Sequence, residues 1–198
     1  MDEIRGTQEV HISRMRLTLW PIQVGLLAAI SKPWFLTDFA CTLAGVPLVT
    51  MHRATNEKTL AHLLDQSALS LLVASHHLTA MIQSAMQLVG RCQLKTLVWL
   101  EDDLEGYGLQ TSQIHQGVPL EALGDCRQMK WTDLLRLGAS FPKQQDVGGR
   151  NPKAIIKLLP SSGSTGLPKL VPVTEDSFFK GFSPNLQCSM DVVVYVAW

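Results

Sequence analysis

Apolar segments of strand length alternate with segments of helical periodicity along the first hundred residues. The continuous apolar runs predict strands at 22–30, 46–51, 68–74 and 95–100. Apolar residues recur every three to four positions in the intervening segments, which predict helices at 33–44, 56–66 and 78–89. Buried strands that alternate with amphipathic helices are typical of parallel βαβ units. We therefore predict an α/β fold, a doubly wound and mostly parallel sheet flanked by helices.

Helix boundary signals support these assignments. Ser31 is an N-cap candidate, Pro33 falls in the first turn, and Gly45 follows the last periodic residue of the first helix. The apolar side expected for this helix comprises Phe35, Phe39, Ala40 and Leu43. Cys41 is interpreted as a small core residue on that helix. The second helix is expected to bury Leu60, Leu63 and Leu64.

The regular alternation stops after residue 100. Residues 101–150 contain an acidic run at 101–103 and scattered glycines, so we expect a surface insertion interrupted by a short helix at 131–137. The remaining elements are predicted as strands at 153–159, 171–174 and 191–198 and a helix at 175–182. Residues 1–19 show no clear periodicity and are expected to form a loosely attached entry segment, followed by the folded unit at 20–198.

Composition and charge narrow the functional classes. The chain has 198 residues, 46% hydrophobic and 17% charged, which is ordinary for a soluble α/β domain. Seventeen basic residues balance seventeen acidic ones, so no net field attracts nucleic acid or an anionic membrane. The apolar stretch at 20–30 is too short to span a bilayer. Four cysteines without a CxxC motif favour a reduced, cytoplasmic protein.

The most informative segment is the polar run PSSGSTGLPK at residues 160–169, placed between two predicted strands. Backbone N–H groups of a glycine-rich turn can converge on anionic oxygens, and the Lys169 ammonium can add compensating charge. Gly163 and Gly166 permit positive φ and a close approach to a ligand. The spacing does not fit a Walker A loop, because Pro168, Lys169 and Leu170 stand where Gly-Lys-Ser/Thr is required. A solvated connector is the alternative interpretation.

Ser161-Ser-Gly-Ser-Thr-Gly-Leu-Pro-Lys169 resembles the signature loop of the AMP-forming acyl-adenylating superfamily of acyl-CoA synthetases, nonribosomal-peptide adenylation domains and luciferases. The context at 28–75 is also similar, more weakly. The resemblance implies that 20–198 is the partial N-terminal subdomain of an AMP-binding (adenylation) domain. It also implies ATP and Mg²⁺ as cofactors, a carboxylic acid as substrate, and coenzyme A or a carrier-protein domain as a possible acyl acceptor. The phosphate-binding residues that it implies are Ser161, Ser162, Gly163, Ser164, Thr165, Gly166 and Lys169.

Two positions depart from the family pattern. Leu170 replaces the glycine that commonly follows Pro-Lys, and Glu175-Asp176 stands where Thr-His-Arg/Lys is frequent. An anionic pair there would repel a phosphate or a carboxylate. The alternative is that both residues simply open a helix, where negative charge is favourable.

The family's substrate pocket, magnesium-binding glutamate and catalytic lysine belong downstream of Trp198, so no catalytic residue is assigned. Two hypotheses follow. In the first, the chain belongs to an enzyme that forms an acyl-AMP but is inactive by itself. In the second, it is a non-enzymatic remnant or interaction module that retains only the phosphate-binding loop.

Other conspicuous residues have simpler interpretations. His76 and His77 are adjacent and lack a third ligand, so we expect surface histidines and no metal site. The tryptophans are too scattered to form a base-stacking platform, which favours core packing over nucleic-acid binding. The methionines at 81 and 86 are likewise expected in the core.

Overall fold

The computed structural model describes residues 23–52, 55–89, 92–100, 125–141, 151–161 and 166–181. The predictions for the entry segment at 1–19, the acidic run at 101–103 and the strand at 191–198 lie outside these ranges. The described strands are β1 (Val24–Leu27), β2 (Leu48–Met51), β3 (Leu71–Ser75), β4 (Thr96–Leu100), β5 (Arg127–Lys130), β6 (Ile155–Ser161) and β7 (Lys169–Thr174).

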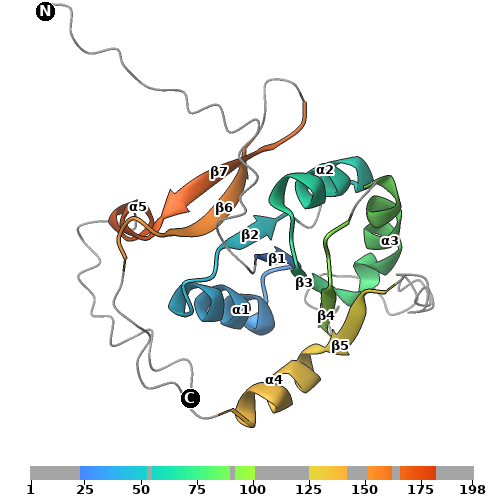
Figure 1. Ribbon diagram of the computed structural model, residues 1–198, viewed down its shortest axis with the longest axis horizontal. Coiled ribbons are helices and arrows are strands. Elements are labelled where there is room, and N and C mark those ends of the chain that lie inside the picture. The colour runs from blue at the N-terminus through green and yellow to red at the C-terminus, as the bar shows by residue number, and fades with distance from the viewer. Residues whose placement is uncertain are drawn as a thin grey trace, which may run out of the picture.

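Within the described residues, seven strands form one sheet in the order β5-β4-β3-β1-β2-β6-β7. Neighbouring strands pair in parallel except for the antiparallel pair of β6 and β7. The predicted mostly parallel α/β fold is therefore confirmed (Figure 1). The described helices are α1 (Lys32–Leu43), α2 (Glu57–Ser67), the 3₁₀ turn η1 (His76–Leu78), α3 (Thr79–Leu88), α4 (Trp131–Ala139) and α5 (Glu175–Gly181).

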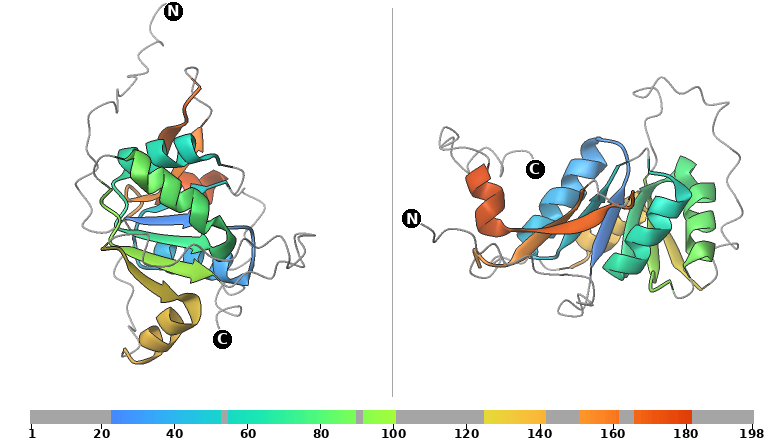
Figure 2. Two further views of the ribbon diagram at one scale, coloured as in Figure 1. Left: turned by 90° about the vertical axis from the view of Figure 1, so that its right-hand side faces the viewer. Right: turned by 90° about the horizontal axis from the view of Figure 1, so that it is seen from above.

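The helices cover the sheet from both sides. The chain passes from β1 through α1 to β2, then returns across β1 through α2 to β3. Right-handed crossovers in opposite directions place their helices on opposite faces of the sheet. Accordingly, α2 and α3 lie on one face and α1 on the other (Figure 2).

The first helix is bounded by the residues that predicted its ends. The Ser31 side chain accepts a hydrogen bond from the backbone N–H of Trp34 at 3.3 Å, and Pro33 occupies the first turn. Gly45 follows the C-terminus with φ of +64°, a conformation that glycine adopts without strain. These local signals explain why the predicted boundaries match the structure closely.

Two hydrophobic cores hold the helices on the sheet. The core beneath α2 and α3, here called the first core, buries the three predicted α2 leucines together with Trp99 of β4. The second core lies on the α1 side and contains Val24, Leu26 and Leu48, with Trp34 and Trp131 packed against it. Trp34, Trp99 and Trp131 therefore serve as packing residues, as their scattered positions predicted.

The predicted apolar side of α1 is wrong. Phe35, Phe39 and Leu43 are 47%, 40% and 51% exposed, whereas the buried side of the helix carries Thr37, Asp38 and Cys41. A buried partner for the Asp38 carboxylate, described below, accounts for this orientation. Cys41 is buried as expected, although on the face opposite to the phenylalanines.

Part of 101–150 belongs to the sheet. No strand was predicted at 127–130 because its residues are mainly polar, but β5 pairs in parallel with β4 at the sheet edge. The Nε1–H of Trp99 donates a hydrogen bond to Oε1 of Gln128 at 2.9 Å, which adds a side-chain link between the two strands. The predicted short helix is confirmed and continues to residue 139.

Candidate functional site

The polar run predicted to bind phosphate lies at the turn of the β6–β7 hairpin. Ser161 and Lys169 are the last paired residues of this antiparallel ladder. Ser161 Oγ also donates a hydrogen bond to the Lys169 carbonyl oxygen at 3.2 Å. The residues that flank the segment 162–168 are thus held together. The prediction of a polar loop between two strands is confirmed.

The loop lies at the edge of the sheet where the parallel strands end. Leu48 of β2 pairs with Lys157 of β6, and both strands run in the direction of β1. The carboxyl end of β6 therefore points to the same edge as the carboxyl ends of the central strands. Open α/β sheets bind ligands outside this edge. The hairpin loop is correctly placed for ligand contact.

Three of the predicted phosphate-binding residues are described. They are Ser161, Gly166 and Lys169; the others, Ser162, Gly163, Ser164 and Thr165, lie outside the described residues. Gly166 has φ of +86°, so its predicted positive φ is confirmed. A residue with a Cβ atom would be strained in this conformation. The positive φ of the backbone therefore explains why position 166 requires glycine.

Lys169 combines a fixed backbone with an exposed side chain. Its carbonyl oxygen accepts the Ser161 hydrogen bond, and its backbone starts β7. Its side chain is exposed, and among the described residues no carboxylate forms an ion pair with its ammonium. The positive charge is accordingly available to an anion at the loop.

A contact from α2 was not predicted. His62 Nε2 lies 3.1 Å from the carbonyl oxygen of Pro168, although the two residues are 106 positions apart in sequence. Figure 1 shows the hairpin rising beside α2. No sequence signal identifies this pair, since a single partly buried histidine on an amphipathic helix has many possible partners.

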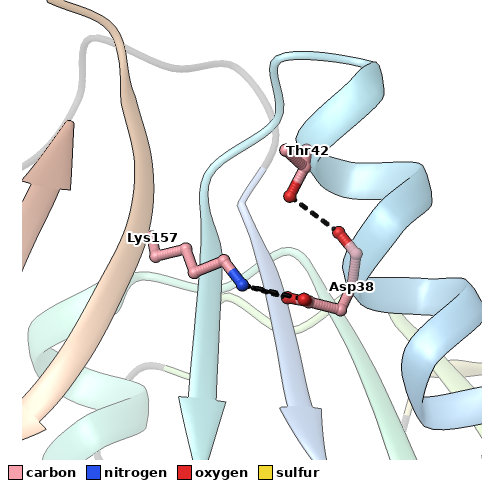
Figure 3. Close-up of polar contacts among 3 residues, drawn as sticks. All are labelled: Asp38, Thr42 and Lys157. Atoms are coloured by element: carbon pink, nitrogen blue, oxygen red, sulfur yellow. Dashed lines mark hydrogen bonds and ion pairs between the residues drawn. The ribbon is translucent and has the colours of Figure 1, made fainter. Parts of the chain in front are cut away.

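A buried ion pair anchors the strand that enters the loop. Lys157 Nζ of β6 lies 2.7 and 2.8 Å from the two carboxylate oxygens of Asp38 in α1 (Figure 3). The same ammonium lies 4.2 Å from the ring centroid of Phe178 in α5. The side chains of Lys157 and Asp38 are 7% and 10% exposed. This contact joins three elements on the α1 side of the sheet.

The signal for this ion pair was present in the sequence. Lys157 is the only charged residue of the otherwise apolar segment 154–160, and a charge in a buried strand requires a partner. Asp38 lies in the middle of a helix with few other charges. The separation of 119 residues prevented pairing the two from sequence alone.

The surroundings of Cys41 disfavour the thiolate form of its side chain. Burial and, to a smaller extent, the nearby Asp38 carboxylate raise the pKa of its thiol to about 12, although Lys157 acts in the opposite direction. Burial also raises the pKa of the Cys126 thiol to about 11, with a smaller contribution from Cys92. Because the thiolate is the reactive form, the raised pKa values disfavour a nucleophilic role for either cysteine near neutral pH.

The two departures from the family pattern have structural explanations. Leu170 is buried in the first core, so the residue after Lys169 contributes packing. Glu175 and Asp176 begin α5, where Thr174 Oγ1 accepts a hydrogen bond from the Ser177 N–H at 3.2 Å. Asp176 also pairs with Lys180 at 2.8 Å. The interpretation of the acidic pair as a helix opening is therefore supported.

The described part of the chain lacks both a metal-binding cluster and a membrane-spanning helix. It contains no group of three or more histidine, cysteine, aspartate or glutamate residues arranged to hold a metal ion. None of its helices has the length and apolar content that crossing a bilayer requires. His76 instead packs edge-on against the Trp99 ring, with centroids 5.5 Å apart.

Comparison with known proteins identifies the family. The family described as AMP-binding enzyme matches residues 22–194. The chain belongs to this family. No match was found among curated proteins. The range that matches the AMP-binding family includes β6, β7 and the segment between them.

Solved structures share the fold. The A-PCP didomain of carboxylic acid reductase from Segniliparus rugosus, in complex with AMP, is 17% identical with a TM-score of 0.59, covering 78% of this chain and 22% of that one. The anthranilate CoA ligase AuaEII in complex with anthranoyl-AMP is 20% identical with a TM-score of 0.58, covering 77% and 25%. The adenylation domain of the carboxylate reductase from Mycobacterium chelonae is 18% identical with a TM-score of 0.58, covering 78% and 24%. This member of the AMP-binding family spans about a quarter of the length of these structures.

Proposed function

We propose that the chain supplies the triphosphate-binding loop of an enzyme that adenylates a carboxylic acid with ATP. The observation that carries the proposal is the position of the signature motif. Its first and last residues, Ser161 and Lys169, pair with each other at the carboxyl edge of the sheet, and the lysine side chain is exposed. Family membership supports the same assignment.

The proposed reaction is an in-line displacement at phosphorus. A carboxylate oxygen attacks the α-phosphorus of ATP, the bond to the bridging oxygen breaks, and acyl-AMP and pyrophosphate are released. Such a reaction depends on positioning and on neutralising the charge of the phosphates. Mg²⁺ would supply part of that charge when bound, and hydroxyl and backbone N–H donors of the loop would orient the β- and γ-phosphates.

The proposed phosphate-binding residues are the seven of the motif, with distinct roles. Lys169 contributes its ammonium, and Gly166 allows the backbone to turn at positive φ. Ser162, Gly163, Ser164 and Thr165 are proposed to supply hydroxyl and backbone donors. The Ser161 hydroxyl donates its hydrogen to the Lys169 carbonyl oxygen. Ser161 therefore contributes mainly by holding the two ends of the loop together.

For the substrate we propose only its chemical class, a carboxylic acid, and for the acyl acceptor likewise only a thiol. The neighbours named above include a CoA ligase with an acyl-AMP and a reductase didomain with AMP. By analogy, the acceptor would be the thiol of coenzyme A or of a carrier-protein domain. We further propose that 20–198 forms the N-terminal subdomain of the adenylation domain, with 1–19 as an entry segment.

Nucleotide binding to the chain tests the proposal. Millimolar Mg·ATP should raise the unfolding temperature of the parent chain, because a ligand that binds only the folded state stabilises it. Lys169→Ala should weaken binding at least about tenfold through the loss of a charge-assisted contact. Lys153→Ala is the matched control, since it removes an exposed lysine near the start of β6, away from the loop. Equal effects of the two substitutions would contradict the assignment.

Catalysis is tested separately by carboxylate-dependent exchange of pyrophosphate into ATP. Exchange that requires an acid and is lost in Lys169→Ala would establish adenylation. Nucleotide binding without exchange would indicate that this chain alone holds the phosphates but lacks the reaction. No stabilisation at millimolar Mg·ATP would favour the non-enzymatic alternative.

A further inference from the structure

The contact between His62 and Pro168 joins α2 to the end of the signature loop. His62 is partly buried, and its Nε2 lies 3.1 Å from the Pro168 carbonyl oxygen. A carbonyl oxygen can only accept a hydrogen bond, so Nε2 carries the proton. The bond is therefore compatible with both the neutral and the charged imidazole.

The helix that carries His62 is firmly placed. The Asn56 side chain caps α2 by accepting the Thr59 N–H at 2.8 Å. The two residues before His62 and the two after it are buried in the first core: Leu60, Ala61, Leu63 and Leu64. A side chain mounted on such a helix can hold a loop with more precision than a side chain on another loop.

The contact fixes the peptide that leads into Lys169. The proline ring restricts φ at residue 168 to about −65°. Anchoring the carbonyl oxygen then restricts ψ, which leaves the peptide plane between Pro168 and Lys169 with a single orientation. On the other side of Lys169, its own carbonyl oxygen accepts from Ser161 Oγ. The Lys169 backbone is thus held from both directions while its side chain stays exposed.

We propose that His62 is a positioning residue of the phosphate site. By holding the Pro168 carbonyl, it fixes the backbone from which the Lys169 side chain projects. This inference rests on the proposed function of Lys169. His62 itself is not proposed to contact the nucleotide, because its donor nitrogen is engaged with the protein backbone.

Two substitutions separate the hydrogen bond from packing. His62→Phe keeps a ring of similar size but removes the donor, and His62→Gln replaces Nε2 by an amide nitrogen at nearly the same reach. We expect His62→Phe to weaken Mg·ATP binding to the full chain about tenfold, measured by titration calorimetry. His62→Gln should restore the affinity to within about threefold of the parent. Amide hydrogen exchange at Lys169 and Leu170 should accelerate in the Phe variant and recover in the Gln variant.

The outcomes distinguish this inference from the proposed function. If Lys169→Ala weakens binding but His62→Phe does not, the positioning role is overturned. It is also overturned if a stably folded His62→Gln fails to restore affinity. If Lys169→Ala leaves Mg·ATP binding unchanged, the proposed phosphate site is wrong. In that case unchanged exchange at Lys169 and Leu170 in His62→Phe would show that the histidine does not order the loop either.

Discussion

Gly25 occupies a position of β1 that leaves no room for a side chain. A Cβ atom built there would lie 2.5 Å from Leu69 Cδ1 and 2.9 Å from Leu72 Cδ1. Both leucines are fully buried in the first core, so they can move aside only by displacing their neighbours in a close-packed interior. We expect Gly25→Ala to lower the free energy of unfolding by about 1–3 kcal/mol through overpacking. Urea denaturation followed by circular dichroism measures the change.

Gly138 provides the matched control for this substitution. It lies in α4, and no heavy atom lies within 4 Å of a Cβ built there. Alanine has a higher helix propensity than glycine, so Gly138→Ala should raise the free energy of unfolding by up to about 1 kcal/mol. Equal destabilisation by both substitutions would mean that the contacts around Gly25 do not determine the result.

At the scale of elements, the Lys157–Asp38 ion pair connects β6 to α1. Its groups are buried and hydrogen-bonded to each other. Removing one partner leaves an uncompensated buried charge, so Lys157→Met alone should lower the free energy of unfolding by about 3 kcal/mol or more. Asp38→Leu alone should have a similar effect. Thermal and urea unfolding of each variant measures the loss.

The double variant tests directly whether Asp38 and Lys157 stabilise the fold as a pair. Replacing both partners by apolar residues removes two buried charges together, and such replacements are often nearly neutral. Asp38→Leu combined with Lys157→Met should therefore recover most of the stability lost in either single variant. A double variant whose losses simply add would show that the two side chains act independently.

Helices and strands that are determined by residues within their own segment were predictable from the sequence. Those determined by contacts with distant segments were not. Apolar runs predicted the central strands. Ser31 marked the start of α1 because its side chain accepts a hydrogen bond from a backbone N–H three residues later, and Gly45 marked the end because it adopts a positive φ. The hairpin loop was located by its glycines and its proline. By contrast, β5 is polar and owes its conformation to pairing with β4. No local pattern specifies such pairing.

The same distinction applies within the candidate site. The motif predicted the loop and its lysine because the relevant residues are contiguous. The contacts that hold the loop, from His62 and from the Lys157–Asp38 pair, join residues more than a hundred positions apart. The face of α1 was wrongly predicted for the same reason. Its orientation follows the buried lysine and not the position of its phenylalanines.

At the scale of the whole molecule, the two sides of the sheet differ in what they expose. On the α2 and α3 side, the helices bury their leucines in the first core. On the other side, α1 presents an outward aromatic face, in which the Phe35 and Phe39 rings stack with centroids 6.3 Å apart. Contiguous exposed apolar groups favour association in water.

The exposed phenylalanines of α1 should make the purified chain self-associate. Phe35→Glu with Phe39→Lys removes both rings and places opposite charges four residues apart on the helix, an arrangement that stabilises helices. We expect this variant to show less concentration-dependent light scattering and weaker binding of an apolar dye, with the free energy of unfolding changed by less than about 1 kcal/mol. Leu88→Lys, which removes an isolated exposed leucine of α3, should leave scattering unchanged. Scattering that falls equally in both variants would mean that exposed apolar surface in general, and not the aromatic face of α1, causes the association. A large loss of stability in the phenylalanine variant would mean that the rings are buried against the rest of the chain.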